Sequence, residues 1–94
     1  MDVAAENIMF VATGPNCWGK GRKMDEAVAN AKKNWPRNYG GIRVPKMKHF
    51  SVRLVVRTRP IDFKDIAVSD IDGSFSYPQG ATLVLLQKSC LAKD

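Results

Sequence analysis

The stretch MDEAVANAKKNW, residues 24–35, carries the clearest secondary-structure pattern in the sequence. Its apolar residues recur at the spacing of one helical face, at Met24, Ala27, Val28, Ala31 and Trp35. Acidic residues occupy the first turn and two lysines stand near the end, the order that the helix dipole favours. We therefore expect one amphipathic helix that ends before Pro36.

β-type runs bounded by Gly and Pro clusters lie on both sides of this helix. Residues 7–13 (NIMFVAT) precede it, and residues 49–59 (HFSVRLVVRTR) follow it. The second run alternates, with Phe50, Val52, Leu54 and Val56 on one face and Ser51, Arg53, Val55, Arg57 and Arg59 on the other. Asp72-Gly73 predicts a hairpin turn between two short strands, and residues 81–89 (ATLVLLQKS) predict the last strand.

One helix with four or five strands, in the order β-α-β-β-β, predicts an α+β fold in which the helix packs on an antiparallel sheet. We expect the helix stripe to meet the apolar face of residues 50–56 and residues 83–86, which leaves the arginines on the opposite, open face. The length of 94 residues suits a single domain, 1–94. Within it, the Pro- and Gly-rich segment 36–48 (PRNYGGIRVPKMK) is expected to be a basic loop.

Composition and the N-terminal sequence predict a soluble cytoplasmic protein without a membrane partner. The apolar fraction of 45% and charged fraction of 26% are those of an ordinary folded chain. No apolar run approaches the roughly 18 residues that span a bilayer, and the first apolar run follows two acids rather than basic residues. Cys17 and Cys90 are expected to be free thiols, although a single bridge between them stays open.

Residues 14–21, GPNCWGKG, come within one residue of the phosphate-loop pattern G-x-x-x-x-G-K-[ST]. The glycines and the lysine match, but Gly21 stands where a magnesium-binding hydroxyl is required. The short chain also lacks room for the parallel sheet that such domains use. We expect instead a Gly-rich turn between strand and helix, whose Lys20, Arg22 and Lys23 begin a basic block.

Other enzyme motifs are equally incomplete. Residues 67–77, AVSDIDGSFSY, are similar to the D-x-D-G-[ST] motif of haloacid-dehalogenase-type phosphatases, in which Asp70 would be the nucleophile and Asp72 the general acid. Too few residues follow Asp72 to supply the later motifs of that site. His49 is the only histidine, so a zinc site would have to gather distant ligands. We expect no enzymatic activity, no metal and no cofactor.

The helix start resembles a segment of HicB-type antitoxins, G-x-T-x-E-E-A-x-x-N-A. The matching residues are Gly21, Glu26, Ala27, Asn30 and Ala31. Lys23 departs from the pattern, because the family has a threonine there that caps the helix. The resemblance covers this segment alone and implies a similar strand–helix packing unit.

Charge is distributed unevenly along the chain. Residues 20–59 contain twelve Lys and Arg against two acids, which gives +10, and the remaining residues give −4, for a net charge of +6. Such a block favours a polyanionic or acidic partner. The alternative is a solvated surface that keeps a small protein soluble.

These patterns predict a small non-enzymatic module that binds nucleic acid through a basic sheet face and loop. The candidate binding residues are cations of the strand, the turn and the loop, together with two aromatic residues that could stack on bases: Arg53, Arg57, Arg59, Lys20, Arg22, Lys23, Lys46, Lys48, Trp18 and Tyr39. The alternative is a phage-like or mobile-element-type regulator that inhibits a host protein through the same face or an exposed sheet edge. A homodimer is compatible with both hypotheses.

Overall fold

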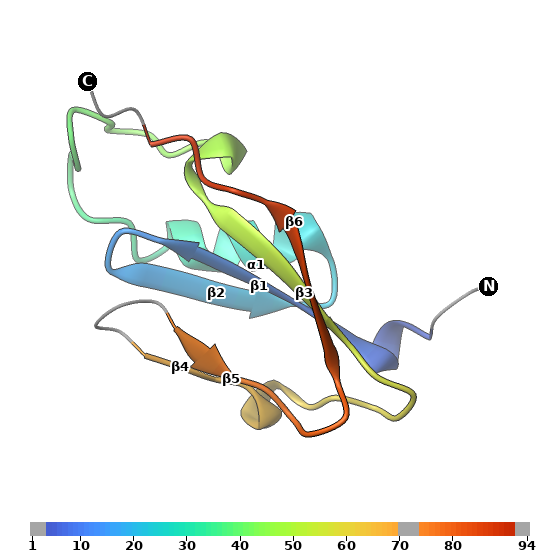
Figure 1. Ribbon diagram of the computed structural model, residues 1–94. Helices are drawn as coiled ribbons and strands as arrows, with labels where there is room; N and C mark the ends of the chain where they lie inside the picture. Colours follow the sequence, from blue (N-terminus) through green and yellow to red (C-terminus); the bar gives the residue numbers. More distant parts are fainter. Residues whose placement is uncertain (1–3, 70–73, 92–94) are drawn as a thin grey trace.

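One helix and two antiparallel sheets make up the computed structural model, which describes residues 4–69 and 74–91 (Figure 1). The main sheet has the order β2-β1-β3-β6, with β1 Ile8–Gly14, β2 Cys17–Gly21, β3 Ser51–Val56 and β6 Thr82–Gln87. Helix α1 spans Met24–Lys32, and β4 (Ala67–Val68) pairs with β5 (Phe75–Ser76) in the small sheet. Short 3-10 helices lie at Ala5–Asn7 (η1), Met47–His49 (η2) and Phe63–Asp65 (η3). The expected α+β class is confirmed.

The predicted hairpin around Asp72-Gly73 is seen through its flanking residues. β4 and β5 pair antiparallel, and the Ser69 amide donates a hydrogen bond to the Ser74 carbonyl oxygen at 2.7 Å. The turn residues themselves, with Asp70, lie outside the described residues.

The prediction that residues 14–21 form a strand-to-helix turn is wrong. Residues 17–21 form β2, which pairs antiparallel with β1, so the order of elements becomes β-β-α-β-β-β. The turn consists of Pro15 and Asn16, and Asn16 adopts a φ of 53°, a conformation that asparagine tolerates better than most residues. The glycines of this stretch therefore belong to a strand.

Close contact with α1 explains why β2 is rich in glycine. A Cβ atom on Gly19 would lie 2.3 Å from the backbone nitrogen of Ala31 and 2.4 Å from the carbonyl oxygen of Ala27. A Cβ atom on Gly21 would lie 2.8 Å from the Ala27 nitrogen. Because alternate residues of a strand face the same side, the spacing of these glycines lets the helix rest directly on the β2 backbone.

Helix α1 ends at Lys32, three residues before the predicted end. The amides of Asn34 and Trp35 donate to the carbonyls of Ala31 and Lys32, at 3.0 and 3.2 Å, which tightens the chain into a turn. Pro36 disfavours helical geometry at the residue before it. Trp35 nevertheless packs against the core beneath the helix, as its place in the helical pattern predicts.

Apolar side chains are buried on both faces of the main sheet. The first cluster lies between α1 and the sheet and consists of Ala12, Cys17, Ala27, Val28, Ala31, Phe50 and Val52. The second cluster lies on the other face, where Met9, Val11 and Val55 are covered by Ile61 and Ile66. The expectation that this second face is open and basic is therefore wrong over its centre, because the chain after β3 folds back across it.

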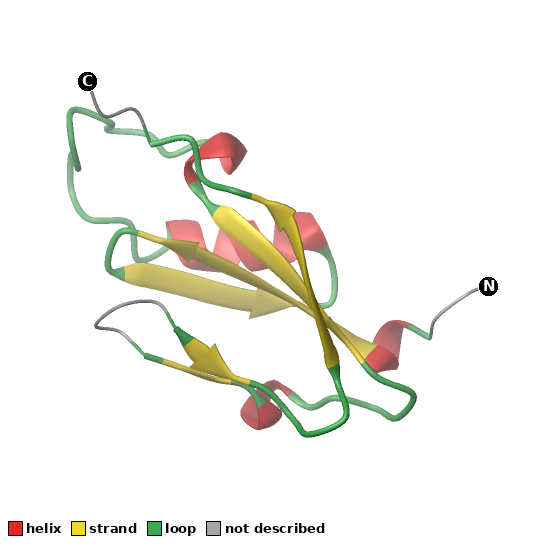
Figure 2. Ribbon diagram, viewed as in Figure 1, coloured by secondary structure: helices red, strands yellow, loops and turns green. Residues whose placement is uncertain are grey.

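The expectation that α1 meets residues 83–86 is also wrong. The helix packs mainly over β2 and β1, and β3 joins the first cluster through Val52, so β6 is left without a helical cover on that side (Figure 2). Val84, which pairs with Leu54, is consequently exposed on the helix side of the sheet. Leu83 and Leu85, which pair with Val55 and Arg53, are exposed on the other face, and Leu86 is exposed as well. In the described part of the chain, no helix has the length and apolar character needed to span a membrane.

Candidate functional site

Two of the basic residues predicted to bind a partner are used to hold the fold together. Lys20 Nζ donates to the carbonyl oxygens of Phe63 (2.5 Å) and Ile66 (2.8 Å), and burial lowers the pKa of this lysine. Arg22 donates to the carbonyl oxygen of Ile8 at 3.0 Å, with its guanidinium 5.2 Å from the Phe63 ring centroid. Both side chains therefore hold in place the segment containing Phe63 and Ile66, which covers the second cluster.

The three arginines predicted to form one row are separated in the structure. Arg57 donates to the backbone carbonyls of Arg59 and Pro60 and forms a 3.5 Å salt bridge with Asp65. Arg59 is exposed in the bend after β3, because the strand ends earlier than its sequence pattern suggests. Arg53 alone lies on the second face of β3, half-buried. The three arginines therefore do not form the predicted row.

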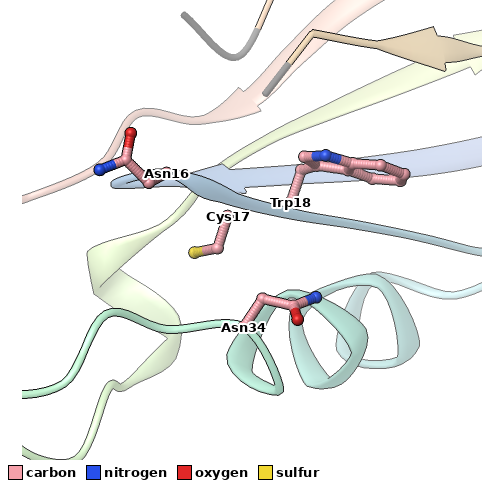
Figure 3. Close-up of a pocket in the computed structure, with 4 residues that line it drawn as sticks. All are labelled: Asn16, Cys17, Trp18 and Asn34. Carbon is pink, nitrogen blue, oxygen red and sulfur yellow. The ribbon is translucent and has the colours of Figure 1, made fainter. Parts of the chain in front are cut away.

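Trp18 lines a hollow of about 590 Å³ together with Asn16, Cys17 and Asn34. Figure 3 shows Cys17 pointing toward the helix side of β2 and Trp18 lying on the other side. Burial raises the pKa of the Cys17 thiol, which keeps it protonated near neutral pH. Both cysteines are free, so the bridge that the sequence left open is not formed.

A second hollow, which we call the basic hollow, lies where α1 passes into the loop. It has a volume of about 530 Å³ and is lined by Lys32, Trp35, Arg37, Asn38, Arg43 and Pro45. Three of these six residues are cations and none is acidic. The hollow therefore combines positive charge with an aromatic wall.

Trp35 organises the loop that forms the basic hollow. Its indole Nε1 donates to the carbonyl oxygen of Ile42 at 3.2 Å, and its ring packs 5.3 Å from the ring of Phe50, centroid to centroid. Tyr39 contacts Trp35 edge to face, with centroids 6.1 Å apart, while 43% of its surface stays exposed. A half-buried aromatic anchor thus holds an exposed aromatic ring beside the cations.

The cations at this end of the molecule form no salt bridge with the carboxylates that the structure describes. Residues 32–48 contain six basic residues and no acidic one. Across residues 4–69 and 74–91, the Arg57–Asp65 salt bridge is the one ion pair, so no described carboxylate pairs with a cation of this segment. The positive charge is therefore available to a partner.

The pKa of the buried His49 is affected by the same positive charge. It is 7% exposed, and its Nδ1 accepts a hydrogen bond from the Lys46 amide at 2.9 Å. Burial lowers its pKa, and the charges of Lys48, Lys46 and Lys32 lower it further.

This arrangement makes stability depend on pH. The folded-state pKa of His49 lies below its unfolded value, so the unfolded chain binds more protons as pH falls through about 6.5. We expect the urea midpoint to be highest above that pH and to fall between pH 7.5 and 5.5, because a protonated Nδ1 can no longer accept from Lys46. Urea titrations by circular dichroism measure this.

The variant His49→Asn is the control for that pH dependence. Asparagine keeps an acceptor near the Lys46 amide but does not titrate, and the sequence has no other histidine. Its midpoint should change little over the same pH interval. An equal decline in both proteins would show that His49 is not the responsible group.

The structure brings together some of the predicted residues and separates others. Tyr39, Lys46 and Lys48 lie on or beside the loop of the basic hollow, whereas Lys23 lies at the opposite end of α1, at its start. Sequence reasoning missed the lining cations Lys32, Arg37 and Arg43. The absence of any acid from residues 32–48 was the feature that could have revealed them.

Comparisons with protein-family models, curated proteins and solved structures find no match to this chain. Among the described residues, no three His, Cys, Asp or Glu side chains gather closely enough to hold a metal ion. The candidate site is accordingly defined by its own geometry and charge.

Proposed function

We propose that the protein is a small non-enzymatic module that binds single-stranded nucleic acid at the basic hollow. The observation that carries the proposal is the meeting of Lys32, Arg37 and Arg43 around the Trp35 indole with no acidic residue in the lining. Guanidinium groups pair with phosphate oxygens in a fixed geometry, and cations without an internal partner release counterions when they bind a polyanion.

The aromatic residues favour a single strand over a duplex. Tyr39 is exposed and braced by Trp35. Unpaired bases stack on such rings whatever their sequence, whereas bases within a duplex already stack on one another. Lys46 and Lys48 extend the positive charge along the loop, so the strand would track the loop and place a base on Tyr39.

Salt-dependent binding is the direct test. Fluorescence anisotropy with a labelled single-stranded oligonucleotide should give an affinity that falls steeply as salt rises, because phosphate contacts dominate. The double variant Arg37→Gln/Arg43→Gln should reduce the slope of log K against log salt by about 1.4, from about 0.7 for each lost contact. The variant Lys23→Gln/Lys64→Gln removes the same charge from exposed positions outside the hollow and should leave most of the affinity.

Two further variants separate this site from the surface that the sequence suggested. Arg53→Gln/Arg59→Gln tests the sheet face, and a larger loss there than at the hollow would move the site to the sheet.

Tyr39→Leu should weaken binding roughly tenfold, within the 1–3 kcal/mol typical of base stacking, whereas Tyr77→Leu, at a similarly exposed tyrosine, should not. Absence of binding at low salt would overturn the proposal and leave the protein-binding alternative.

A further inference from the structure

The outer edge of β6 is an exposed and largely apolar surface. β6 is the last strand of the sheet order, so one side of its backbone has no strand partner among residues 4–69 and 74–91. Its exposed apolar side chains are Leu83 (37% exposed), Val84 (40%), Leu85 (53%) and Leu86 (43%). Edge strands normally carry charges, prolines or bulges that prevent pairing, and an exposed apolar edge therefore marks a docking site.

The opposite edge of the same sheet shows the protection that β6 lacks. β2 carries Lys20 within the strand, and the glycines on its helix side offer no side chain to a new neighbour. Residues 82–87 of β6 contain no charge, no proline and no glycine, and the register shift in its pairing with β3 comes only at its end, between Leu85 and Gln87. The contrast between the two edges points to a specific use for β6.

We propose that this edge pairs with β6 of a second copy of the chain, antiparallel and about a two-fold axis perpendicular to the sheet. Residues 83–86 of β6 are apolar on both faces of the strand. Such a segment fits a partner strand that is also apolar on both faces, and β6 itself meets that requirement. A cationic chain would attract an acidic partner to its charged surfaces, whereas the uncharged β6 has no group to recognise one. Closed two-fold pairing is also the commonest arrangement of identical subunits.

Charge selects the antiparallel direction. Each copy carries +6, and Lys88 directly follows β6. Parallel pairing in register would place the two Lys88 side chains together, which is unfavourable. A two-fold axis at Val84 instead places Lys88 opposite Gly80 of the second copy and Leu83 opposite Leu85 of the second copy.

The local geometry of β6 favours an axis at Val84. Its regular pairing with β3 runs from Thr82 to Leu85, and the register shifts before Gln87. The Gln87 side chain donates to the carbonyls of Met47 and Phe50, at 2.7 and 2.9 Å, and so holds the end of the strand toward η2. The regularly paired segment available to a second copy therefore has Leu83 and Val84 at its centre, and an axis at Val84 places the exposed Leu83 and Leu85 opposite each other.

Sedimentation velocity over a micromolar concentration series tests the pairing. The wild-type chain should sediment as a dimer, and Leu85→Lys should shift it to a monomer with an unchanged circular dichroism spectrum. Val44→Lys makes a similar change at an apolar loop residue that is 75% exposed, and it should remain dimeric. A monomeric wild type, or a dimer that survives Leu85→Lys, would overturn the proposal; a monomeric wild type would indicate a strand from another protein as the occupant.

Cross-linking gives a measurement that does not depend on a charged variant folding. In a Cys90→Ser background, Val84→Cys should form a covalent dimer with a short bismaleimide, while Val44→Cys should not. Equal cross-linking of the two variants would contradict pairing at this edge.

Dimerisation should persist or strengthen as salt rises, because salt screens repulsion between the copies, whereas nucleic-acid binding should weaken. The two proposals can therefore fail independently.

Discussion

Gly19→Ala is expected to lower the free energy of unfolding by about 3 kcal/mol or more, at the upper end of overpacking effects. The added methyl group would lie 2.3 Å from the Ala31 nitrogen and 2.4 Å from the Ala27 carbonyl oxygen. Both atoms belong to the helix backbone, which cannot turn aside as a side chain can. The helix must move off β2, and the first cluster beneath it opens. Urea unfolding followed by circular dichroism measures the loss.

Gly40→Ala separates this contact from a backbone effect. Gly40 has a φ of 57°, and no atom lies within 4 Å of the point that an added methyl group would occupy, so alanine there meets strain but no clash. Left-handed conformation costs a non-glycine residue roughly 1–2 kcal/mol. Gly19 lacks a left-handed φ, so its larger loss would come from packing alone. Similar losses in the two variants would contradict the close helix–strand contact.

Phe50→Ala should be the second severe substitution, with a loss of about 3–5 kcal/mol. Phe50 is fully buried, its ring packs against Trp35, and it lies close beneath the Gly14 backbone. The substitution leaves a cavity between the sheet and the loop of the basic hollow. Chemical denaturation gives the loss, and Trp35 fluorescence should report a more polar environment.

Phe63→Ala provides the matched control. Phe63 is 46% exposed, and its ring mainly supports the guanidinium of Arg22. Its removal should cost about 1 kcal/mol or less, within the range of an exposed cation–π contact. If this variant were destabilised as strongly as Phe50→Ala, the special importance of Phe50 in the first cluster would be contradicted.

The two stability predictions bear on the proposed function through Trp35. This residue connects the first cluster to the loop that carries Arg37 and Arg43. A binding surface on a loop keeps its geometry when a buried group anchors it. The core around Phe50 is therefore also the support of the basic hollow.

Local patterns were enough to predict the α+β class, the single helix and the positive charge. The helical spacing from Met24 to Ala31 and the alternation within β3 each report which face of an element is apolar. The basic block was visible in the same way, because charge is a property of composition. Such features depend on residues near one another in the chain, so sequence alone determined them.

Tertiary packing decided the role of the glycines, the exposure of β6 and the location of the candidate site. Gly19 and Gly21 have no side chains that could show a strand pattern. Their role, which is to let α1 pack directly on the β2 backbone, can be recognised only in the folded structure. The placement of α1 over β1 and β2 leaves β6 uncovered. Likewise, Lys20 is bound to the distant carbonyl oxygens of Phe63 and Ile66, while Lys32, Arg37 and Arg43 meet at one hollow. These outcomes depend on which distant segments pack together, because burial and hydrogen bonding across the fold determine which charges stay exposed and which strand edge stays open.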